Sequence, residues 1–462
     1  MTTKLQPSAY DPAPQIATVA DSIAVPVRPA SFPDAKLRFR NDRWAASVGL
    51  DSLDDSQWIA HFGRFEPLPG NLPQPLALAY HGHQFRVYNP DIGDGRGFLF
   101  AQLRDHTGRL LDLGTKGSGT TPFSRQGDGR LTLKGGVREI LATEMLEALG
   151  VNTSKTFSLI ETGEPLWRND EPSPTRSSVL VRLSHGHIRI GTFQRLAALG
   201  DEDALRRLVR YALDTYHDGA SGENDAALLL ERVVEKTAEL AASYMAAGFV
   251  HGVLNTDNIN ISGESFDYGP WRWTPRWDPG FTAAYFDHAG LYAFARQPEA
   301  IYWNCGQLAI ALRTISGAPP LIAALETFGD IYQREAARRF LWRLGIMPTT
   351  PDEDLPLVSA AQEALRRSEI SIDRFFFDWM GKTIDPPSGY DAPSFAELKT
   401  MLNSRTAFRS REHRYWRQDT PCSMHIDEVE SIWSAIDQDD NWTPLYAKVE
   451  AIRTMGDALR GP

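Results

Sequence analysis

Residues 251–260 read HGVLNTDNIN and place Asp257 directly before Asn258 in a short polar stretch. Nine residues after Asn258, the triplet DYG begins with Asp267. Mg²⁺ binds few protein oxygens together with substrate phosphates, and one amide oxygen with one carboxylate fits that need. We therefore expect Asn258 and Asp267 to hold a divalent metal ion. A capped turn at NTDN and an ordinary turn at DYG are the structural alternatives.

The spacing of this stretch is that of the catalytic loop in kinase-like phosphotransferases, with one exception. In those enzymes an aspartate five residues before the metal-binding asparagine accepts the proton of the substrate hydroxyl. Val253 stands at that position and cannot accept a proton. The loop therefore belongs either to an inactive kinase-like protein or to an enzyme whose base has moved. Asp257 is the carboxylate that can serve as that base.

Two glycine-rich turns occur in the first half of the chain, DIGDGRG and SRQGDGR. Glycines let backbone amides approach phosphate oxygens because no Cβ intervenes, and an arginine fork matches phosphate geometry. Plain hairpin turns are the alternative for both. The candidate nucleotide-binding residues in these turns are Gly93, Gly95, Arg96, Asp128 and Gly129.

Four charged residues of the first half complete the predicted phosphate site. Lys116 follows the strand-like run LLDLGT, and Glu139 lies early in the helical run VREILATEMLEALG, which is the order of the kinase lysine and its helix glutamate. Arg182 lies in the strand-like VRLS, and Arg189 follows after a short turn. Two arginines beside a nucleotide loop exceed what one γ-phosphate needs. A solvent-facing strand edge is the alternative.

Composition limits the class of protein. The 462 residues carry a formal net charge of −11, so no basic excess exists to displace counterions, and we expect no nucleic-acid binding. The N-terminal residues lack the pattern of a signal peptide, and no apolar run is long enough for a membrane span. Cys305 and Cys422 are the two cysteines, which suits a reducing cytoplasm and predicts no disulfide framework or zinc ligand set.

Strand-like runs dominate the first half and helical runs the second. The runs GFLFAQLRD, LLDLGTK, TFSLIET and SSVLVRLS predict strands, with VREILATEMLEALG as the helix between them. We expect RLAALGDEDALRRLVRYALDTY to be one long helix, and Asn224 or Asp225 to cap the next. Further helices are expected at about 318–345 and 354–368. Residues 1 to about 35 are expected to form an extended or partly disordered arm.

This order predicts an α+β, two-lobed, protein-kinase-like fold, with a strand-rich N-lobe that bears one key helix and a mostly helical C-lobe. We expect an N-terminal extension at 1–70 and a nucleotide-binding N-lobe at 71–193. The helical C-lobe with the catalytic and metal-binding loops follows at 194–400, and a C-terminal extension at 401–462.

Taken together, several motifs resemble those of the selenoprotein O family, also called the YdiU family. They lie between residues 80 and 281 in family order: YHGHQF, NPDIGDGRG, TKGSGTTPFSRQGDGR, VREILATE, SHGHIRIGTF, GFVHGVLNTDNINI, DYGP and DPGF. The resemblance implies a pseudokinase fold, ATP bound in a flipped orientation, and transfer of AMP to Ser, Thr or Tyr hydroxyls of proteins. It also implies Mg²⁺ or Mn²⁺ as cofactor.

Carried over by motif, the resemblance implies a role for each candidate residue. Asp257 would accept the proton, Asn258 and Asp267 would bind the metal, and Lys116 would pair with Glu139. The ATP contacts would come from Gly93, Gly95, Arg96, Lys116, Asp128, Gly129, Arg182, Arg189 and Asp267. One departure is Arg86, which stands where the family motif GHQFG has glycine.

Two other functions stay open at this point. A metal-dependent phosphotransferase could use Asp257 as its base, and a pseudokinase scaffold could bind nucleotide without turnover. The expected partners are ATP and proteins with acceptor hydroxyls, with no membrane and no nucleic acid, and the expected state is a monomer.

Overall fold

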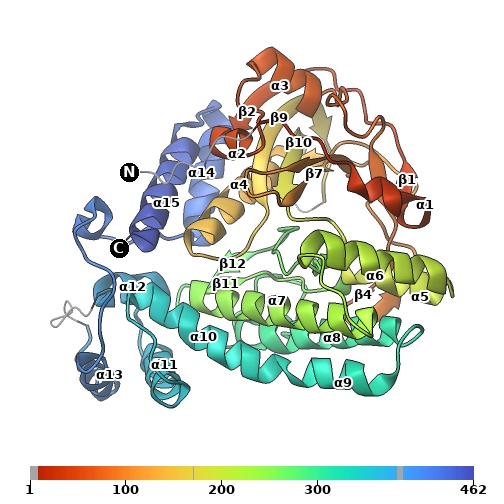
Figure 1. Ribbon diagram of the computed structural model, residues 1–462. Helices are drawn as coiled ribbons and strands as arrows, with labels where there is room; N and C mark the ends of the chain where they lie inside the picture. The colour runs from red at the N-terminus through yellow and green to blue at the C-terminus, as the bar shows by residue number, and fades with distance from the viewer. Residues whose placement is uncertain (1–8, 170, 382–388, 462) are drawn as a thin grey trace.

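A computed structural model describes residues 9–169, 171–381 and 389–461, with a sheet-based half lying against a helical half (Figure 1). The sheet has eight strands in the order β1-β3-β6-β7-β10-β9-β2, with β8 paired to β10, and all its pairs are antiparallel. The strands are β1 (Ala24–Pro26), β2 (Lys36–Arg40), β3 (Leu76–Leu78), β6 (Leu99–Arg104), β7 (Leu110–Lys116), β8 (Leu131–Thr132), β9 (Lys155–Leu166) and β10 (Thr175–Ser184). A separate hairpin pairs β4 (Gly82–Gln84) with β5 (Val87–Asn89).

Both faces of this sheet are covered, which is why its central strands read as continuous apolar runs. Helices α2 (Asp42–Ser47) and α3 (Asp55–Phe62) cover one face, where Trp58 and Phe62 pack on Phe157. The other face packs on α4 (Leu133–Ala148), whose N-cap Thr132 accepts a hydrogen bond from Gly135 N. Val137, Leu141 and Met145, which recur every fourth residue of α4, are fully buried. The four predicted strands and this helix are confirmed.

The N-terminal segment differs from the expected arm. Residues 1–8 lie outside the described part, but from residue 9 onward the chain is built into the sheet-based half. It forms η1 (Gln15–Thr18), α1 (Ala20–Ile23) and strand β1, which pairs with β3. The expectation of disorder for residues 9–35 is therefore wrong. Ile16, Val19 and Ile23 are the segment's buried apolar anchors, at a helical spacing of i, i+3 and i+7.

The helical half is built from nine helices within the described residues. These are α5 (Ile190–Ala198), α6 (Glu202–Tyr216), α7 (Asp225–Ala247), α8 (Gln297–Leu312), α9 (Ala318–Glu326), α10 (Phe328–Leu344), α11 (Pro351–Arg366), α12 (Ile372–Trp379) and α13 (Pro393–Asn403). Between α7 and α8 come β11 (Phe249–Val250), η2 (Thr256–Asn258), β12 (Arg272–Trp273) and η3 (Phe294–Arg296). The catalytic-loop candidates therefore lie in the connection that follows α7.

One expected helix is two helices. The run from residue 195 to 216 breaks at Gly200, whose φ of 68° is left-handed, and α6 restarts with Asp201 as its N-cap. Glycine ends helices in this conformation because it has no Cβ penalty. The cap of α7 is as predicted, since the Asn224 side chain accepts from Ala227 N.

The C-terminal segment folds back onto the sheet-based half. It contains η4 (Arg414–Arg417), α14 (Ile426–Asp439) and α15 (Thr443–Arg460), and α14 and α15 lie beside α4 (Figure 1). Arg453 of α15 binds Glu144 of α4 at 2.6 Å, and Asp440 binds Arg176 of β10 at 2.7 Å. The predicted α+β arrangement, with a strand-rich half bearing one key helix and a mostly helical half, is confirmed. Its four residue boundaries stay predictions, and residues 382–388 lie outside the described part. Of the helices that are described, none is long and apolar enough to cross a membrane.

Candidate functional site

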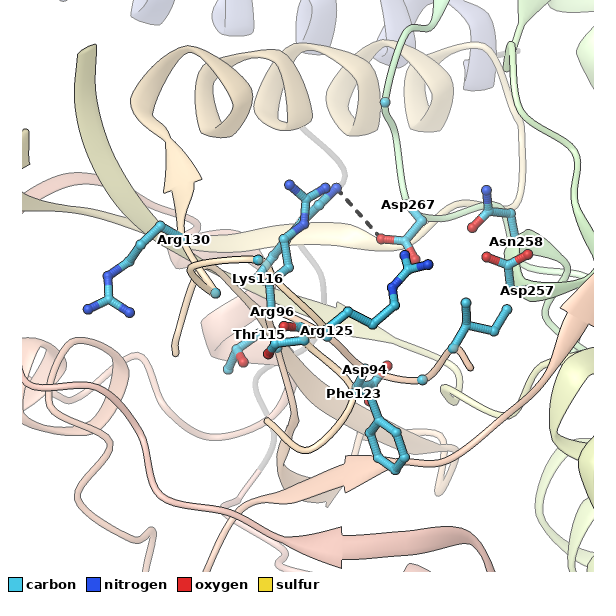
Figure 2. A pocket seen from close by; sticks show the side chains of 18 of the residues that line it. Asp94, Arg96, Thr115, Lys116, Phe123, Arg125, Arg130, Asp257, Asn258 and Asp267 are labelled. Atoms are coloured by element: carbon cyan, nitrogen blue, oxygen red, sulfur yellow. Dashed lines mark hydrogen bonds and ion pairs between the residues drawn. The ribbon is translucent and has the colours of Figure 1, made fainter. Parts of the chain in front are cut away.

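A cavity of about 710 Å³ opens between the two halves (Figure 2). The sheet-based half supplies the end of β7, the two glycine-rich turns and Arg182, while the helical half supplies Arg189 and the loops after α7. The residues that line it include Tyr80, Gly93, Asp94, Gly95, Arg96, Lys116, Arg125, Asp128, Gly129, Arg168, Arg182, Arg189, Val253, Asp257, Asn258 and Asp267. All predicted site residues except Glu139 line this cavity.

Lys116 and Glu139 form the expected pair. Lys116 ends β7 and Glu139 lies in α4, and Nζ is 2.5 Å from Oε1. Their side chains are 7% and 1% exposed, so Glu139 is a buried partner that fixes the lysine from behind. The pairing was predicted from an order along the chain, and the sheet brings the two residues together.

Asp267 is the carboxylate around which the buried cations of the cavity gather. Its carboxylate lies 2.8 Å from Arg182 Nη1, 3.2 Å from Arg189 Nη2 and 3.6 Å from Lys116 Nζ. Burial acts to raise the pKa of Asp267, but the charges of Arg182, Lys116 and Arg189 outweigh it and hold that pKa well below its usual value. The backbone of Asp267 is left-handed, with φ 62°, which aspartate tolerates better than most residues. Three buried cations therefore converge on one carboxylate.

Two partners of Arg189 were not predicted. Asp94 Oδ1 lies 3.2 Å from Arg189 Nη1, and the guanidinium lies 4.4 Å from the ring centroid of Tyr80. Asp94 also accepts from Leu78 N, which ties the first glycine-rich turn to β3. Its position inside the motif GDG was the available signal, because a carboxylate in that turn faces whatever the glycines approach.

The first glycine-rich turn is packed closely against residues 121–125. A Cβ at Gly93 would lie 2.4 Å from Phe123 Cγ, and one at Gly95 would lie 3.0 Å from Phe123 O. Close packing accounts for these glycines, and both also line the cavity. Arg96 lines it beside them. Arg125, which the sequence placed only as a neighbour of Asp128, is a cavity residue as well, with a left-handed φ of 54°.

The second glycine-rich turn is held by Arg168, which was not among the predicted site residues. Both oxygens of Asp128 accept from Arg168, at 2.8 and 3.1 Å, and Gly129 has a left-handed φ of 69°. Although burial opposes it, hydrogen bonding to Arg168 keeps the pKa of Asp128 below its usual value. Arg130 pairs with Glu164 at 2.6 Å and is directed away from the Asp257 side of the cavity (Figure 2).

Asp257 and Asn258 lie in η2 on the opposite wall (Figure 2). Asp257 Oδ2 is 3.4 Å from Gln84 Nε2, and its buried Oδ1 has no hydrogen-bond partner within residues 9–169, 171–381 and 389–461. Burial raises the pKa of Asp257 to about 6, against the charge of Arg189, which lowers it. Such a carboxylate is ionised at neutral pH and still basic enough to take a proton. Gln84 was missed because the motif YHGHQF was given no role beyond the family resemblance.

The residues present fit a divalent cation with oxygen ligands. Asn258 Nδ2 donates to Val253 O at 3.0 Å, which leaves the amide oxygen of Asn258 as the side that can bind a cation. Asp267 supplies a carboxylate, and an ion with few protein ligands takes its other oxygens from phosphates. Within the described residues, no three His, Cys, Asp or Glu side chains group as metal ligands.

Two further sequence features have structural explanations. Cys305 and Cys422 are buried and unpaired, and burial raises their pKa values to about 12 and about 11, so neither is a reactive thiol. Arg86 adopts the left-handed φ of 65° that the glycine in GHQFG would take without strain. Its side chain compensates by pairing with Glu299 at 3.1 Å and lying over the Trp303 ring at 5.4 Å.

Comparison with known proteins identifies one family along nearly the whole chain. Residues 8–453 match the family model described as protein adenylyltransferase SelO. The chain belongs to this family. A "protein nucleotidyltransferase YdiU" from Synechococcus elongatus is 43% identical over 97% of this chain and 95% of its own, and one from Synechocystis is 41% identical over 98% and 100%.

Among solved structures, the kinase domain of a Toxoplasma gondii rhoptry antigen is 11% identical. It covers 72% of this chain and 83% of its own, with a TM-score of 0.24. That score carries no argument about the site. Membership of the SelO family rests on the sequence matches, which also span the N-terminal and C-terminal segments.

Proposed function

We propose that this chain is a protein adenylyltransferase that moves AMP from ATP to Ser, Thr or Tyr hydroxyls of proteins. The observation that carries the proposal is the convergence of Lys116, Arg182 and Arg189 on Asp267 inside the cavity. Three buried cations are more than one departing γ-phosphoryl group requires. They suit a nucleotide whose terminal phosphates are held inward while the α-phosphate faces the acceptor.

In the proposed reaction, residues on the two walls of the cavity have different roles. The acceptor oxygen forms a bond to the α-phosphorus, the bond from that phosphorus to the bridging oxygen of the β-phosphate breaks, and pyrophosphate leaves. Asp257 takes the acceptor proton, because it lines the cavity and burial raises its pKa to about 6. Lys116, Arg182 and Arg189 stabilise the negative charge that gathers on the leaving pyrophosphate. Electrostatic clamping of this kind supplies most of the catalysis in phosphoryl-type transfer.

We assign Asn258 and Asp267 as the ligands of Mg²⁺ or Mn²⁺, which would neutralise phosphate charge when bound. Gly93, Gly95, Arg96, Asp128 and Gly129 would contact the nucleotide from the two glycine-rich turns, and Glu139 would hold Lys116. Cytoplasmic location and a monomeric state stay predictions of the sequence.

The test uses ATP labelled at either the α- or the γ-phosphate, incubated with the protein, Mg²⁺ or Mn²⁺ and a cell extract. We expect protein-bound label from the α-phosphate alone, and its loss in Asp257→Asn. The control is Asp278→Asn, because Asp278 is an exposed carboxylate in the same connection. Label from the γ-phosphate alone would mean a phosphotransferase. Bound ATP with no label from either position would mean a scaffold.

A further inference from the structure

Behind Arg182, away from the cavity, three buried polar side chains form a chain of hydrogen bonds. Arg182 Nε lies 3.3 Å from His187 Nε2, His187 Nδ1 lies 3.2 Å from Asp112 Oδ2, and Asp112 Oδ1 lies 2.7 Å from Gln102 Nε2. Gln102, Asp112 and His187 are 0%, 1% and 3% exposed. None of the three lines the cavity, and none has a part in the proposed transfer. A buried polar chain of this length costs free energy unless each member is satisfied.

The N-terminal segment fixes the direction of this chain. The backbone N–H of Ile16 donates to Gln102 Oε1 at 2.7 Å, so the amide oxygen of Gln102 faces η1 and its nitrogen faces Asp112. Asp112 therefore receives a donor on Oδ1. Because a carboxylate only accepts, its Oδ2 must also face a donor, which is His187 Nδ1–H.

This order determines the tautomer of His187. With the proton on Nδ1, Nε2 carries a lone pair and can accept from Arg182 Nε–H. A proton on Nε2 would set two donors against each other at 3.3 Å. Ser184 Oγ also lies 3.3 Å from Nδ1 and can share its proton as an acceptor. The imidazole thus acts as a neutral bridge between a carboxylate and a guanidinium.

The sheet makes room for the bridge at one glycine. Gly114 of β7 lies opposite Arg182 of β10, and a Cβ at Gly114 would lie 2.1 Å from His187 Nε2. With Nε held by His187, the Arg182 guanidinium presents Nη1 to Asp267 at 2.8 Å, on the cavity side. Nε and Nη1 of Arg182 are therefore both held by protein partners before a ligand binds.

We propose that Gln102, Asp112 and His187 are positioning residues that set the orientation of Arg182 toward the phosphates of the nucleotide. The proposal rests on the function proposed above, in which Arg182 holds the terminal phosphates. At metal sites, residues that orient the ligating groups typically change metal affinity or activity by about 10- to 100-fold when they are altered, and we expect an effect of that order here.

The decisive variant is Asp112→Asn, which keeps the shape but reverses one hydrogen bond. Gln102 Nε2 still requires an acceptor, so the oxygen of the introduced amide turns to it and the nitrogen of that amide donates to His187 Nδ1. His187 must then carry its proton on Nε2, which faces Arg182 Nε–H. An Asp-to-Asn change beside a catalytic histidine is known to act through such a wrong tautomer.

Two changes at His187 separate polarity from bulk. In His187→Gln the amide can still donate to Asp112 and accept from Arg182, whereas His187→Leu can do neither. The matched control for acid-to-amide change is Glu144→Gln. Glu144 is buried in the same half and binds Arg453, on the side of α4 that faces α15.

The measurement is the Kd of ATP and of AMP by calorimetry on the full chain, with the unfolding temperature recorded for each variant. We expect Asp112→Asn and His187→Leu to weaken ATP binding about tenfold or more. AMP, which lacks the terminal phosphates, should change less than about twofold, and His187→Gln and Glu144→Gln should bind ATP nearly as the wild type does.

ATP binding by His187→Leu equal to that of His187→Gln would overturn the proposal, and so would an equal loss in Glu144→Gln. The His187 pair decides the question even if Asp112→Asn does not fold. Failure of the proposed function is a different result, because it would appear as absence of α-phosphate label in the wild type while these binding differences persist.

Discussion

Replacing Asp267 by Asn tests the charge arrangement of the site most directly. Three cations and three carboxylates make up the cluster: Lys116 pairs with Glu139, Arg189 with Asp94, and all three cations face Asp267. The substitution removes one negative charge and leaves the cluster with one uncompensated positive charge. Breaking a buried pair by removing one partner costs about 3–5 kcal/mol.

We therefore expect Asp267→Asn to lower the free energy of unfolding by roughly 3 kcal/mol or more. The sign with pH follows from the depressed pKa of Asp267. That carboxylate is ionised in the folded protein at a pH where the unfolded chain is already protonated, so its stabilisation is present above the usual aspartate pKa and is lost as the pH falls below it. The difference between wild type and variant should shrink on acidification below about pH 4.

Nucleotide binding should separate the two roles of Asp267. In EDTA, the phosphates of ATP can replace the missing charge, so the variant should bind ATP as tightly as the wild type or more tightly. Adding Mg²⁺ should tighten binding in the wild type and not in the variant, and AMP transfer should be lost. Calorimetry with and without Mg²⁺, together with denaturant unfolding, measures both effects. Asp278→Asn is the control, and a variant that gains affinity from Mg²⁺ as the wild type does would refute the metal assignment.

Four further outcomes are expected. Glu139→Gln should weaken ATP binding about tenfold or more in calorimetry, because Lys116 loses the partner that fixes it; unchanged affinity would mean that the pair is only structural. Burial raises the pKa of Glu264 to about 7. The wild type should therefore lose up to roughly 3 kcal/mol of unfolding free energy as the pH rises from about 4.5 to 7, and Glu264→Gln should keep it. Denaturant unfolding measures the difference, and parallel pH profiles of the two proteins would contradict this. Arg86→Gly should leave the unfolding free energy within about 1 kcal/mol and transfer unchanged, because relief of a left-handed φ offsets an exposed ion pair; a large loss of transfer would give Arg86 a role in catalysis. Val253→Asp should not produce γ-phosphate label, and appearance of that label would mean that the missing kinase aspartate alone decides the reaction.

Local pattern predicted the parts of the site that follow directly from strand and helix order. The strands, α4 and the order of Lys116 and Glu139 could be placed because each depends on a periodicity or spacing within about 25 residues. Asp257, Asn258 and Asp267 could be predicted as site residues for the same reason, since they lie in one short connection.

The parts that were missed depend on contacts between distant residues. The Ile16–Gln102 hydrogen bond spans 86 positions and the His187–Asp112 bond spans 75, so no window of sequence contains both partners. A lone buried histidine reads as ordinary core, and the N-terminal residues read as an arm because they are rich in Pro, Ala and Ser. Their role emerges only when the sheet places β6, β7 and β10 side by side.

The substitution of the kinase aspartate by Val253 is compatible with an active site because the loop uses that residue through its main chain. Asn258 Nδ2 donates to the backbone carbonyl of Val253 at 3.0 Å, a contact that any residue at this position could supply. Val253 lines the same cavity as Asp257 and Asp267. A further carboxylate there would add negative charge where we propose that the phosphates lie, and would compete for the cations that Asp267 already balances. With Asp257 one residue before Asn258, the loop still offers the base and the metal ligand that we propose, without that cost. Moving the proposed base along the same loop would account for the valine.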